Sequence, residues 1–275
     1  MSFNVGVIGL GYVGKAVEAV FSKKNRVFSY DINNNCSESS LKSVVNKAEI
    51  IFVCVPTPML KDGSCHTGIL SEVINDINIL GFNKDVLIKS TIPPKTSETL
   101  QHKNKKINII FNPEFMTEAN FIDDFTNQKR VILAGKNLDK VEQLFSITFP
   151  RAKIVKLSYR EAELVKYFSN TFLATKVSFA NEIYSLCEKL EVNYPTMLKA
   201  LLLDERIGNS HLQVPGPDGK RGFGGSCLPK DIAALIKIFK DQGIDSPILD
   251  SVWKRNTEID RKEKDWEKLK GRAVI

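Results

Sequence analysis

The sequence predicts an α/β fold in which a mostly parallel sheet, with helices on both faces, is followed by an all-helical region. Three observations support this. Short apolar runs alternate with segments of helical period through the first half of the chain, as in a parallel sheet with helical crossovers. A glycine-rich turn follows the first apolar run. Strand signals then stop near residue 158, which places a boundary between residues 1–157 and residues 158–275.

Each element is expected where its residue pattern is strongest. Runs typical of strands fall at residues 4–8, 26–30, 50–55, 85–89, 108–111, 130–134 and 153–155. Segments of helical period lie between them at residues 12–22, 70–80 and 138–149. One helix without Gly or Pro is expected at residues 159–190, followed by helices at 195–203, 229–242 and 247–270. A loop rich in Gly and Pro, residues 214–225, directly precedes Ser226 and Cys227.

Composition excludes several classes of protein. No apolar run approaches the ~20 residues of a membrane span. The apolar start at residues 5–13 has no basic residue before it and is broken by glycines, so it is not a signal peptide, and we expect a soluble, cytoplasmic protein. The formal charge of +7 is modest and interspersed, which argues against nucleic-acid binding and fits an anionic small-molecule substrate. Five cysteines, an odd number without a Cys-x-x-Cys pair, indicate neither disulfides nor a metal site; we expect no metal.

The segment from Gly9 through Gly11 to Gly14 follows the first strand and opens a helix. Glycines allow the tight turn and let the backbone approach a pyrophosphate at the helix N-terminus. Asp31 ends the next strand, where a carboxylate hydrogen-bonds the adenosine ribose and repels a 2′-phosphate. The alternative is a turn that serves only helix–strand packing. The coincidence of strand, glycines, helix and acid favours a Rossmann-type domain that binds NAD.

The stretch from Gly224 to Asp231 carries the clearest chemical signal. Pro229 suits the first turn of a helix, so Cys227 stands just ahead of a helix N-terminus that favours a thiolate. Asp231 falls one turn later on the same side. The alternative is that Cys227 is a small packed residue and that Asp231 only helps the helix to start. The glycines before Cys227 favour a nucleophile, because they let a substrate approach the backbone.

Several segments together resemble the UDP-glucose/GDP-mannose dehydrogenase family, and the resemblance runs in order along essentially the whole chain. Those enzymes oxidise the C6 alcohol of a nucleotide sugar to a carboxylate in two NAD-dependent steps, most commonly on UDP-glucose. The segments are Gly9-Leu-Gly-Tyr-Val-Gly14, Val55-Pro-Thr-Pro58, Lys89-Ser-Thr-Ile-Pro-Pro94, Asn112-Pro-Glu-Phe-Met116, Glu163-Leu-Val-Lys166 through Asn181-Glu182, Asp204-Glu-Arg-Ile-Gly208 and Gly222-Phe-Gly-Gly-Ser-Cys-Leu-Pro-Lys-Asp231.

The resemblance implies roles for individual residues. Cys227 would attack the aldehyde intermediate to give a thiohemiacetal and then a thioester. Lys166 would place a cation beside the reacting oxygen, and Asn170, four residues on, would donate to the oxyanion-like intermediate. Thr91 and Asp231 match residues that hold water or move a proton. Glu114 and Glu118 match carboxylates near thioester hydrolysis. The choice of general base among a water held by Thr91, Lys166, Asp231 and these two glutamates stays open.

Further residues are implied for binding. The cofactor set is Gly9, Gly11, Tyr12, Val13, Gly14, Asp31, Val55, Pro56, Thr57, Thr91 and Glu118. The substrate set is Phe115, Met116, Lys166, Asn170, Arg206 and Gly224. Arg206 matches an arginine that reaches the neighbouring subunit's substrate, and the helix at 159–190, about 48 Å at 1.5 Å per residue, matches the family's dimer helix. A homodimer is therefore expected.

The chain also departs from the family pattern. Full-length members continue into a domain that binds the nucleotide of the substrate, and residues 269–275 are expected to be only its first strand. The chain is then a compact enzyme, a truncated core, or a core completed by a separate chain. We also consider Lys220 and Arg221 as ligands for a diphosphate. Two rival functions are a β-hydroxyacid-type dehydrogenase, which transfers one hydride without a cysteine, and a non-catalytic NAD-binding module.

Overall fold

The computed structural model describes residues 2–33 and 35–275, which form two compact units. The first unit contains the chain up to Thr57 together with His66–Lys166. The second contains Pro58–Cys65 and Tyr167–Ile275. The division falls inside a long helix, so the domain boundary placed at residue 157 from strand signals stays a prediction.

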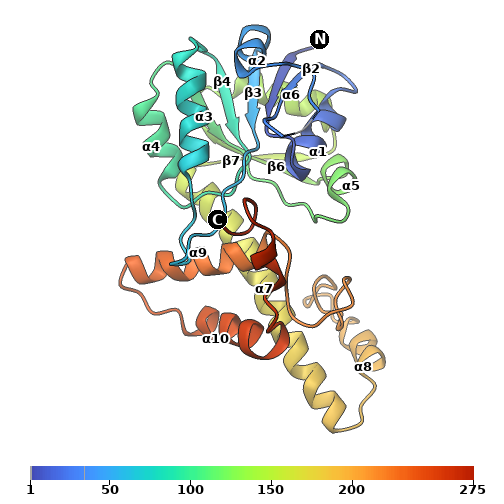
Figure 1. Cartoon of the computed structure of the whole chain (residues 1–275). Coiled ribbons are helices and arrows are strands. Elements are labelled where there is room, and N and C mark those ends of the chain that lie inside the picture. Colours follow the sequence, from blue (N-terminus) through green and yellow to red (C-terminus); the bar gives the residue numbers. More distant parts are fainter. Residues whose placement is uncertain (1, 34) are drawn as a thin grey trace. The chain divides into compact units, whose positions relative to one another are not determined.

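The first unit is built on a seven-stranded sheet with the order β2-β1-β3-β4-β5-β6-β7 (Figure 1). Neighbouring strands run parallel except β5 and β6, which are antiparallel. The predicted mostly parallel sheet is therefore confirmed. The strands are β1 (Asn4–Ile8), β2 (Arg26–Tyr30), β3 (Ile50–Val53), β4 (Asp85–Ile88), β5 (Asn108–Phe111), β6 (Arg130–Gly135) and β7 (Lys153–Leu157).

Helices cover both faces of this sheet. Helices α2, α3 and α4, with the first turns of α7 (Tyr159–Lys189), pack against one face, and α1, α5 and α6 pack against the other (Figure 1). Their bounds are α1 (Tyr12–Phe21), α2 (Leu41–Lys47), α3 (Gly68–Ile79), α4 (Thr96–Lys103), α5 (Phe121–Thr126) and α6 (Asp139–Thr148). The sequence did not predict α2, α4 and α5, because helices of 6 to 8 residues are too short to establish a period.

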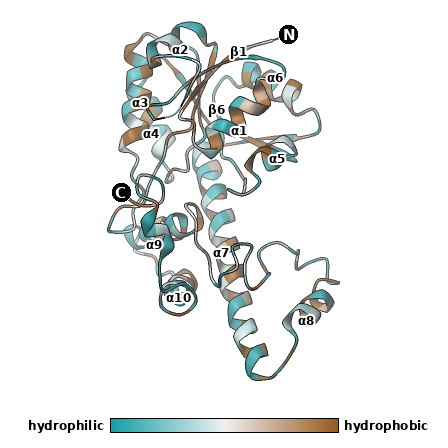
Figure 2. Ribbon diagram, turned by 45° about the vertical axis from the view of Figure 1, so that its right-hand side comes forward, coloured by the Kyte–Doolittle hydropathy of each residue, from teal (hydrophilic) through white to brown (hydrophobic). Residues whose placement is uncertain are grey.

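Successive side chains of the strands point to opposite faces of the sheet and pack into two separate hydrophobic cores. In β1, Val5 and Val7 pack against α1 and α6, whereas Ile8 packs with α2 and α3 on the other face. In β3, Phe52 and Val53 alternate in the same way. Figure 2 shows the resulting concentration of hydrophobic residues in the strands. Because both faces are covered, the polar ends of the strands remain the place where this sheet can bind a ligand.

The second unit is helical. Its helices are the remainder of α7 (Tyr159–Lys189), then α8 (Tyr194–Leu201), α9 (Leu228–Asp241) and α10 (Pro247–Arg255). Tyr167 of α7 packs with Ala234 and Leu235 of α9. Farther along α7, Ala174 packs with residues of α9 and α10. Within the described residues, the structure contains no helix with the length and apolarity that a membrane span requires.

The helix predicted at residues 247–270 is wrong in its second half. After α10 the chain forms a π-helical turn (Asn256–Asp260) and, beyond it, a short 3-10 helix (Asp265–Lys268). Arg261 leaves the helical region with φ −140°, and Lys264 adopts φ 44°. Alternating charges therefore do not mark one solvated helix here, because Asn256, Arg261 and Trp266 are buried.

Candidate active site

The glycine turn of the first unit has the geometry of a phosphate-binding loop. Gly9 has a φ of 88°. A Cβ on Gly14 would lie 1.8 Å from the carbonyl oxygen of Gly9, so only glycine permits this packing of helix against turn. Gly11 caps the N-terminus of α1, and a Cβ there would meet nothing within 4 Å. The turn thus leaves open space in front of a helix N-terminus, which suits a pyrophosphate.

Asp31 lies beside this turn at the end of β2. One carboxylate oxygen accepts a 2.6 Å hydrogen bond from the backbone N–H of Leu10, and the other accepts one from Asn33. The contact fixes the acid next to the glycine turn, where an adenosine ribose would lie. The residues present therefore fit a dinucleotide with a 2′-hydroxyl.

Two polar loops follow the neighbouring strands β3 and β4 and are hydrogen-bonded together. The hydroxyl of Ser90 donates to the carbonyl of Val55 at 2.6 Å. The hydroxyl of Thr57 donates to the carbonyl of Thr91 at 2.8 Å. Thr57 and Thr91 are both buried. The carboxyl ends of two parallel strands thus hold the predicted residues Val55, Thr57 and Thr91 in one place.

A buried ion pair links the loop after β5 to α7. Lys166 Nζ lies 2.8 Å from Glu114 Oε1, with side-chain exposures of 3% and 8%. Burial opposes ionisation of Glu114, but the Lys166 ammonium, the N–H of Met116 and Lys89 outweigh it and lower the pKa of Glu114. Lys166 also lies over the ring of Phe115. The two residues, 52 positions apart in the sequence, therefore form one charged site.

A second buried lysine stands near this pair and had no role in the sequence prediction. Lys89 Nζ donates to Asn112 Oδ1 at 3.0 Å and lies over the ring of Phe125. Burial lowers the pKa of Lys89 to about 8, although the fields of Cys54 and Glu114 oppose this. The sequence feature that could have pointed to Lys89 as a site residue is its place at the end of an apolar strand, directly before Ser90.

Glu163 fixes the start of α7 against α4. Its carboxylate is fully buried and accepts 2.8 Å hydrogen bonds from the N–H groups of Lys95 and Ser97, at the N-terminus of α4. Burial raises the pKa of Glu163, although these N–H groups favour its ionised form. Because Glu163 lies one turn before Lys166, this contact also fixes the part of α7 that carries the lysine.

The second unit carries the cysteine. Cys227 is the N-cap residue of α9, as predicted, and Asp231 donates its backbone N–H to the carbonyl of Cys227. The side chain of Asp231 is buried and accepts a 2.5 Å hydrogen bond from Asn170 Nδ2. Its other oxygen pairs with Lys230 Nζ. Cys227 thus begins the helix whose first turn carries a buried carboxylate.

Lys230 is a member of this cluster that sequence reasoning left without a role. Burial opposes its charge, but the Asp231 carboxylate and the sulfur atoms of Cys227 and Cys65 outweigh burial and raise the pKa of Lys230. An ammonium group held charged three residues after Cys227 favours a negative charge on sulfur. The sequence feature that could have pointed to Lys230 as a site residue is its place between Pro229 and Asp231.

The other predicted residues are more dispersed. Lys220 Nζ lies 3.1 Å from both Glu263 and Asp265, and Arg221 pairs with Glu188, so both cations already have acidic partners. Arg206 is 89% exposed and pairs with Asp204. The remaining predicted residues are partly or largely exposed, namely Tyr12, Val13, Pro56, Met116 and Glu118. Their binding roles stay predictions.

Comparison with known proteins gives matches along most of the chain. A model of the UDP-glucose/GDP-mannose dehydrogenase family, NAD binding domain, matches residues 33–149. A model of the central domain of that family matches residues 160–258. The prediction of NAD as the cofactor is confirmed by the first match. Among curated proteins, the UDP-glucose 6-dehydrogenase of Rickettsia bellii is 39% identical over 224 residues, or 78% of this chain and 50% of that protein.

The chain spans about half the length of the curated relatives it matches first. Among solved structures, a UDP-glucose dehydrogenase from Pyrobaculum islandicum matches with a TM-score of 0.83 and 28% identity, covering 93% of this chain and 68% of that one. A 3-hydroxyisobutyrate dehydrogenase of Mycobacterium tuberculosis matches with a TM-score of 0.76 and 15% identity, covering 98% and 100%. The last likeness shows the fold alone.

Proposed function

Because the chain belongs to the UDP-glucose/GDP-mannose dehydrogenase family, we propose that it oxidises the C6 alcohol of a nucleotide sugar to the uronic acid in two steps. UDP-glucose, which becomes UDP-glucuronate, is the substrate we place first, since curated relatives carry that name. The observation that carries the proposal is the position of Cys227 at the N-terminus of α9, beside Lys230 and the buried Asp231.

Each of the two oxidations would need its own NAD, which when bound would accept the hydride, so two NAD would be reduced per sugar. The N-terminus of α1 behind Gly11 would hold its pyrophosphate, and Asp31 its adenosine ribose. In the first oxidation the alcohol also loses its hydroxyl proton. Thr91, through a bound water, and Asp231 are candidates for taking that proton, and the choice between them stays open.

The second oxidation needs the cysteine. Cys227 Sγ adds to the aldehyde carbon to form a C–S bond, and the carbonyl oxygen takes a proton to give a thiohemiacetal. Loss of a second hydride and of that proton leaves a thioester. Water then breaks the C–S bond, releasing the carboxylate and the thiol. Asn170 and Lys166, one helical turn apart in α7, would stabilise the negative oxygen in these steps.

A homodimer is part of the proposal. The large apolar side chains Phe168, Phe172, Phe179 and Leu186 of α7 are more than half exposed. Their spacing of four, seven and seven residues places them on one face of the helix. A second copy of the chain is the occupant we propose for this face. It would bring the exposed Arg206 of one subunit toward the substrate of the other.

Five cysteines without a paired motif support a reducing compartment, and we propose the cytoplasm. The other candidate functions are an NAD-binding core that turns over only with another chain, and a single-step dehydrogenase of the β-hydroxyacid type. This chain shares its fold with the 3-hydroxyisobutyrate dehydrogenase of M. tuberculosis. No observation on this chain favours a single-step oxidation. A cysteine in the N-cap position argues for the two-step reaction.

The direct test uses the 275-residue chain with NAD and a panel of nucleotide sugars. Chromatography identifies the acid product, with UDP-glucose, GDP-mannose and N-acetylated UDP-sugars as substrates. We expect UDP-glucuronate from UDP-glucose. Binding of NAD without any oxidised sugar would favour the core that needs another chain, and a reduced cofactor with an aldehyde product would favour the single oxidation.

A further inference from the structure

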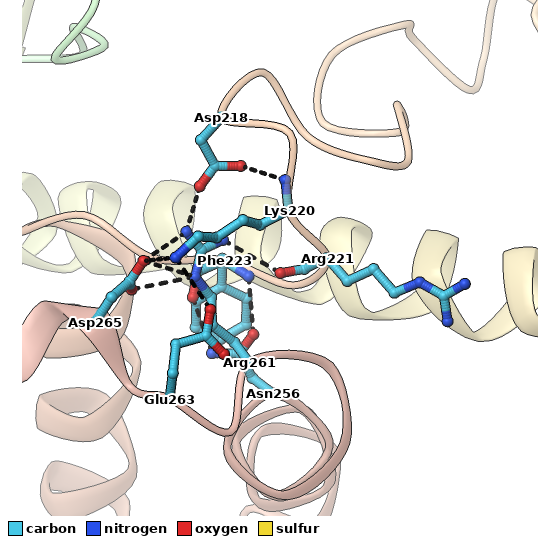
Figure 3. A network of polar contacts seen from close by, with 8 residues as sticks. All are labelled: Asp218, Lys220, Arg221, Phe223, Asn256, Arg261, Glu263 and Asp265. Carbon is cyan, nitrogen blue, oxygen red and sulfur yellow. Dashed lines mark hydrogen bonds and ion pairs between the residues drawn. The ribbon is translucent and has the colours of Figure 1, made fainter.

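The loop that leads to Cys227 is bound by a segment that follows α10. Figure 3 shows the contacts. Asn256, which has no exposed surface, accepts a hydrogen bond from the N–H of Phe223 at 2.8 Å and donates one to the carbonyl of Phe223 at 2.9 Å. One side-chain amide therefore satisfies both backbone groups of a loop residue, as a neighbouring β-strand would.

Arg261 forms a second attachment next to the first (Figure 3). Its side chain is only 3% exposed and pairs with the carboxylates of Asp218 and Asp265. Its Nη1 also donates to the carbonyl oxygen of Arg221 at 3.2 Å. Two carboxylates and one carbonyl thus converge on one buried guanidinium, whose planar shape fixes their relative directions.

The glycines of the loop lie directly against these two side chains. A Cβ on Gly222 would come within 2.4 Å of Asn256 Oδ1, and Gly222 has a φ of 65°. A Cβ on Gly224 would lie 2.8 Å from the guanidinium carbon of Arg261. At Gly222 the positive φ and the contacts with the segment after α10 exclude a side chain, whereas at Gly224 a side chain would push aside the Arg261 guanidinium and the Asp265 carboxylate.

We propose that Asn256 and Arg261 are positioning residues that hold residues 222–224 and thereby set the place of Cys227 at the start of α9. Cys227 is only three positions after Gly224, so a displacement of the loop also displaces the start of α9 and the sulfur. Neither side chain touches the reacting atoms. The catalytic consequence rests on the proposed function, because only the second oxidation needs Cys227.

The experiment compares Asn256→Ala and Arg261→Ala with the unchanged chain in two assays. In rapid mixing with NAD and UDP-glucose, we expect the second phase of NADH formation to slow by ~10- to 100-fold, as a misplacement near 1 Å does, and to slow more than the first phase. In the second assay, iodoacetamide alkylation of Cys227, followed by peptide mass spectrometry, slows by at least about threefold because the thiolate is less well stabilised.

Conservative variants keep the test decisive if an alanine variant unfolds. Asn256→Asp retains the acceptor for the Phe223 N–H but loses the donor, and Arg261→Lys retains the charge but not the planar fork. Both should fall between the unchanged chain and the alanine variants. Lys262→Ala is the matched control, since it removes an exposed cation next to Arg261 and should change neither assay. Emission of Trp253 and Trp266, whose rings lie 5.8 Å apart, reports whether the segment stays folded.

Equal slowing of both NADH phases, or no slowing with unchanged or faster alkylation, would overturn the positioning role. If the unchanged chain forms no NADH from any nucleotide sugar, the proposed function fails instead. The order of alkylation rates then still decides the role of Asn256 and Arg261. Rates equal to that of the unchanged chain would overturn it, and the graded order would support it.

Discussion

Asn170 of α7 donates its side-chain amide to the buried carboxylate of Asp231 in α9, with 2.5 Å between nitrogen and oxygen. The contact joins two helices of the second unit and fixes Asp231 in the first turn that Cys227 begins. Asp231 also pairs with Lys230, so one carboxylate holds both an amide donor and a cation. Asn170, Lys230 and Asp231 therefore stabilise one another as a buried cluster, in addition to any role in the chemistry.

Asp231→Asn should damage both stability and activity. It leaves Lys230, 11% exposed, without its anionic partner, and breaking such a pair costs about 3–5 kcal/mol. Urea unfolding at pH 7 measures this cost. Lys230→Met combined with Asp231→Asn should recover most of the stability, because no unpaired charge remains, but not the NADH production. Recovery of activity in the double variant would contradict a chemical role for Asp231.

Lys89 predicts how stability changes with pH. Burial lowers the pKa of Lys89 to about 8 in the folded chain, against ~10.4 for a lysine in the unfolded chain. Between these values the unfolded state holds more protons, so raising the pH stabilises the fold. Relative to Lys89→Met, the unchanged chain should gain up to about 3 kcal/mol between pH 7.5 and 10.5, by urea unfolding. A constant difference would show that the folded Lys89 titrates normally.

Asp31→Ala should weaken NAD binding and reduce the preference of the chain for NAD over NADP. The carboxylate is lost both as a ribose ligand and as the acceptor for the Leu10 N–H in the glycine turn. We expect roughly a tenfold or greater rise in the dissociation constant for NAD, about 1.4 kcal/mol, and a smaller change for NADP. Fluorescence titration measures both constants. Asn33→Ala, two residues on, is the control and should leave them unchanged.

Phe172→Glu should produce a monomer. This ring is 56% exposed, and a carboxylate at its position would have to be desolvated between two copies of α7. Sedimentation velocity at micromolar concentration should show the smaller species, whereas Lys189→Glu, near the end of α7, should not change the association state. Equal sedimentation of the Phe172 variant and the unchanged chain would refute the proposed interface.

The sequence predicted the sheet better than the connections around it. Each strand of the described residues was predicted, because short runs rich in β-branched and aromatic residues alternate with helical segments. The long α7 was predicted because no Gly or Pro interrupts it. The short helices α2, α4 and α5 escaped detection. The prediction at 247–270 failed because the burial of Arg261 depends on Asp218, more than forty residues earlier in the chain.

The candidate site could likewise be predicted only where residues close together in the sequence determine it. The glycine turn with Asp31, and Cys227 at a helix start, could be recognised because their logic is local. The pairing of Lys166 with Glu114 and of Asn170 with Asp231 joins residues 52 and 61 positions apart, and spacing alone does not determine such contacts. The hydrogen bonds between Asn256 and the backbone of Phe223 could not be predicted either, because an asparagine in a segment of helical period is usually solvated.

The number of NADH molecules formed per sugar consumed decides whether the chain carries out a second oxidation that depends on Cys227. The measurement compares the unchanged chain with Cys227→Ser under single-turnover conditions, with NAD in excess over UDP-glucose. We predict two NADH for the unchanged chain and at most one for the variant, because the second hydride leaves from an adduct that needs the thiol. Two NADH from both proteins, or one from both, would contradict a cysteine-dependent second oxidation.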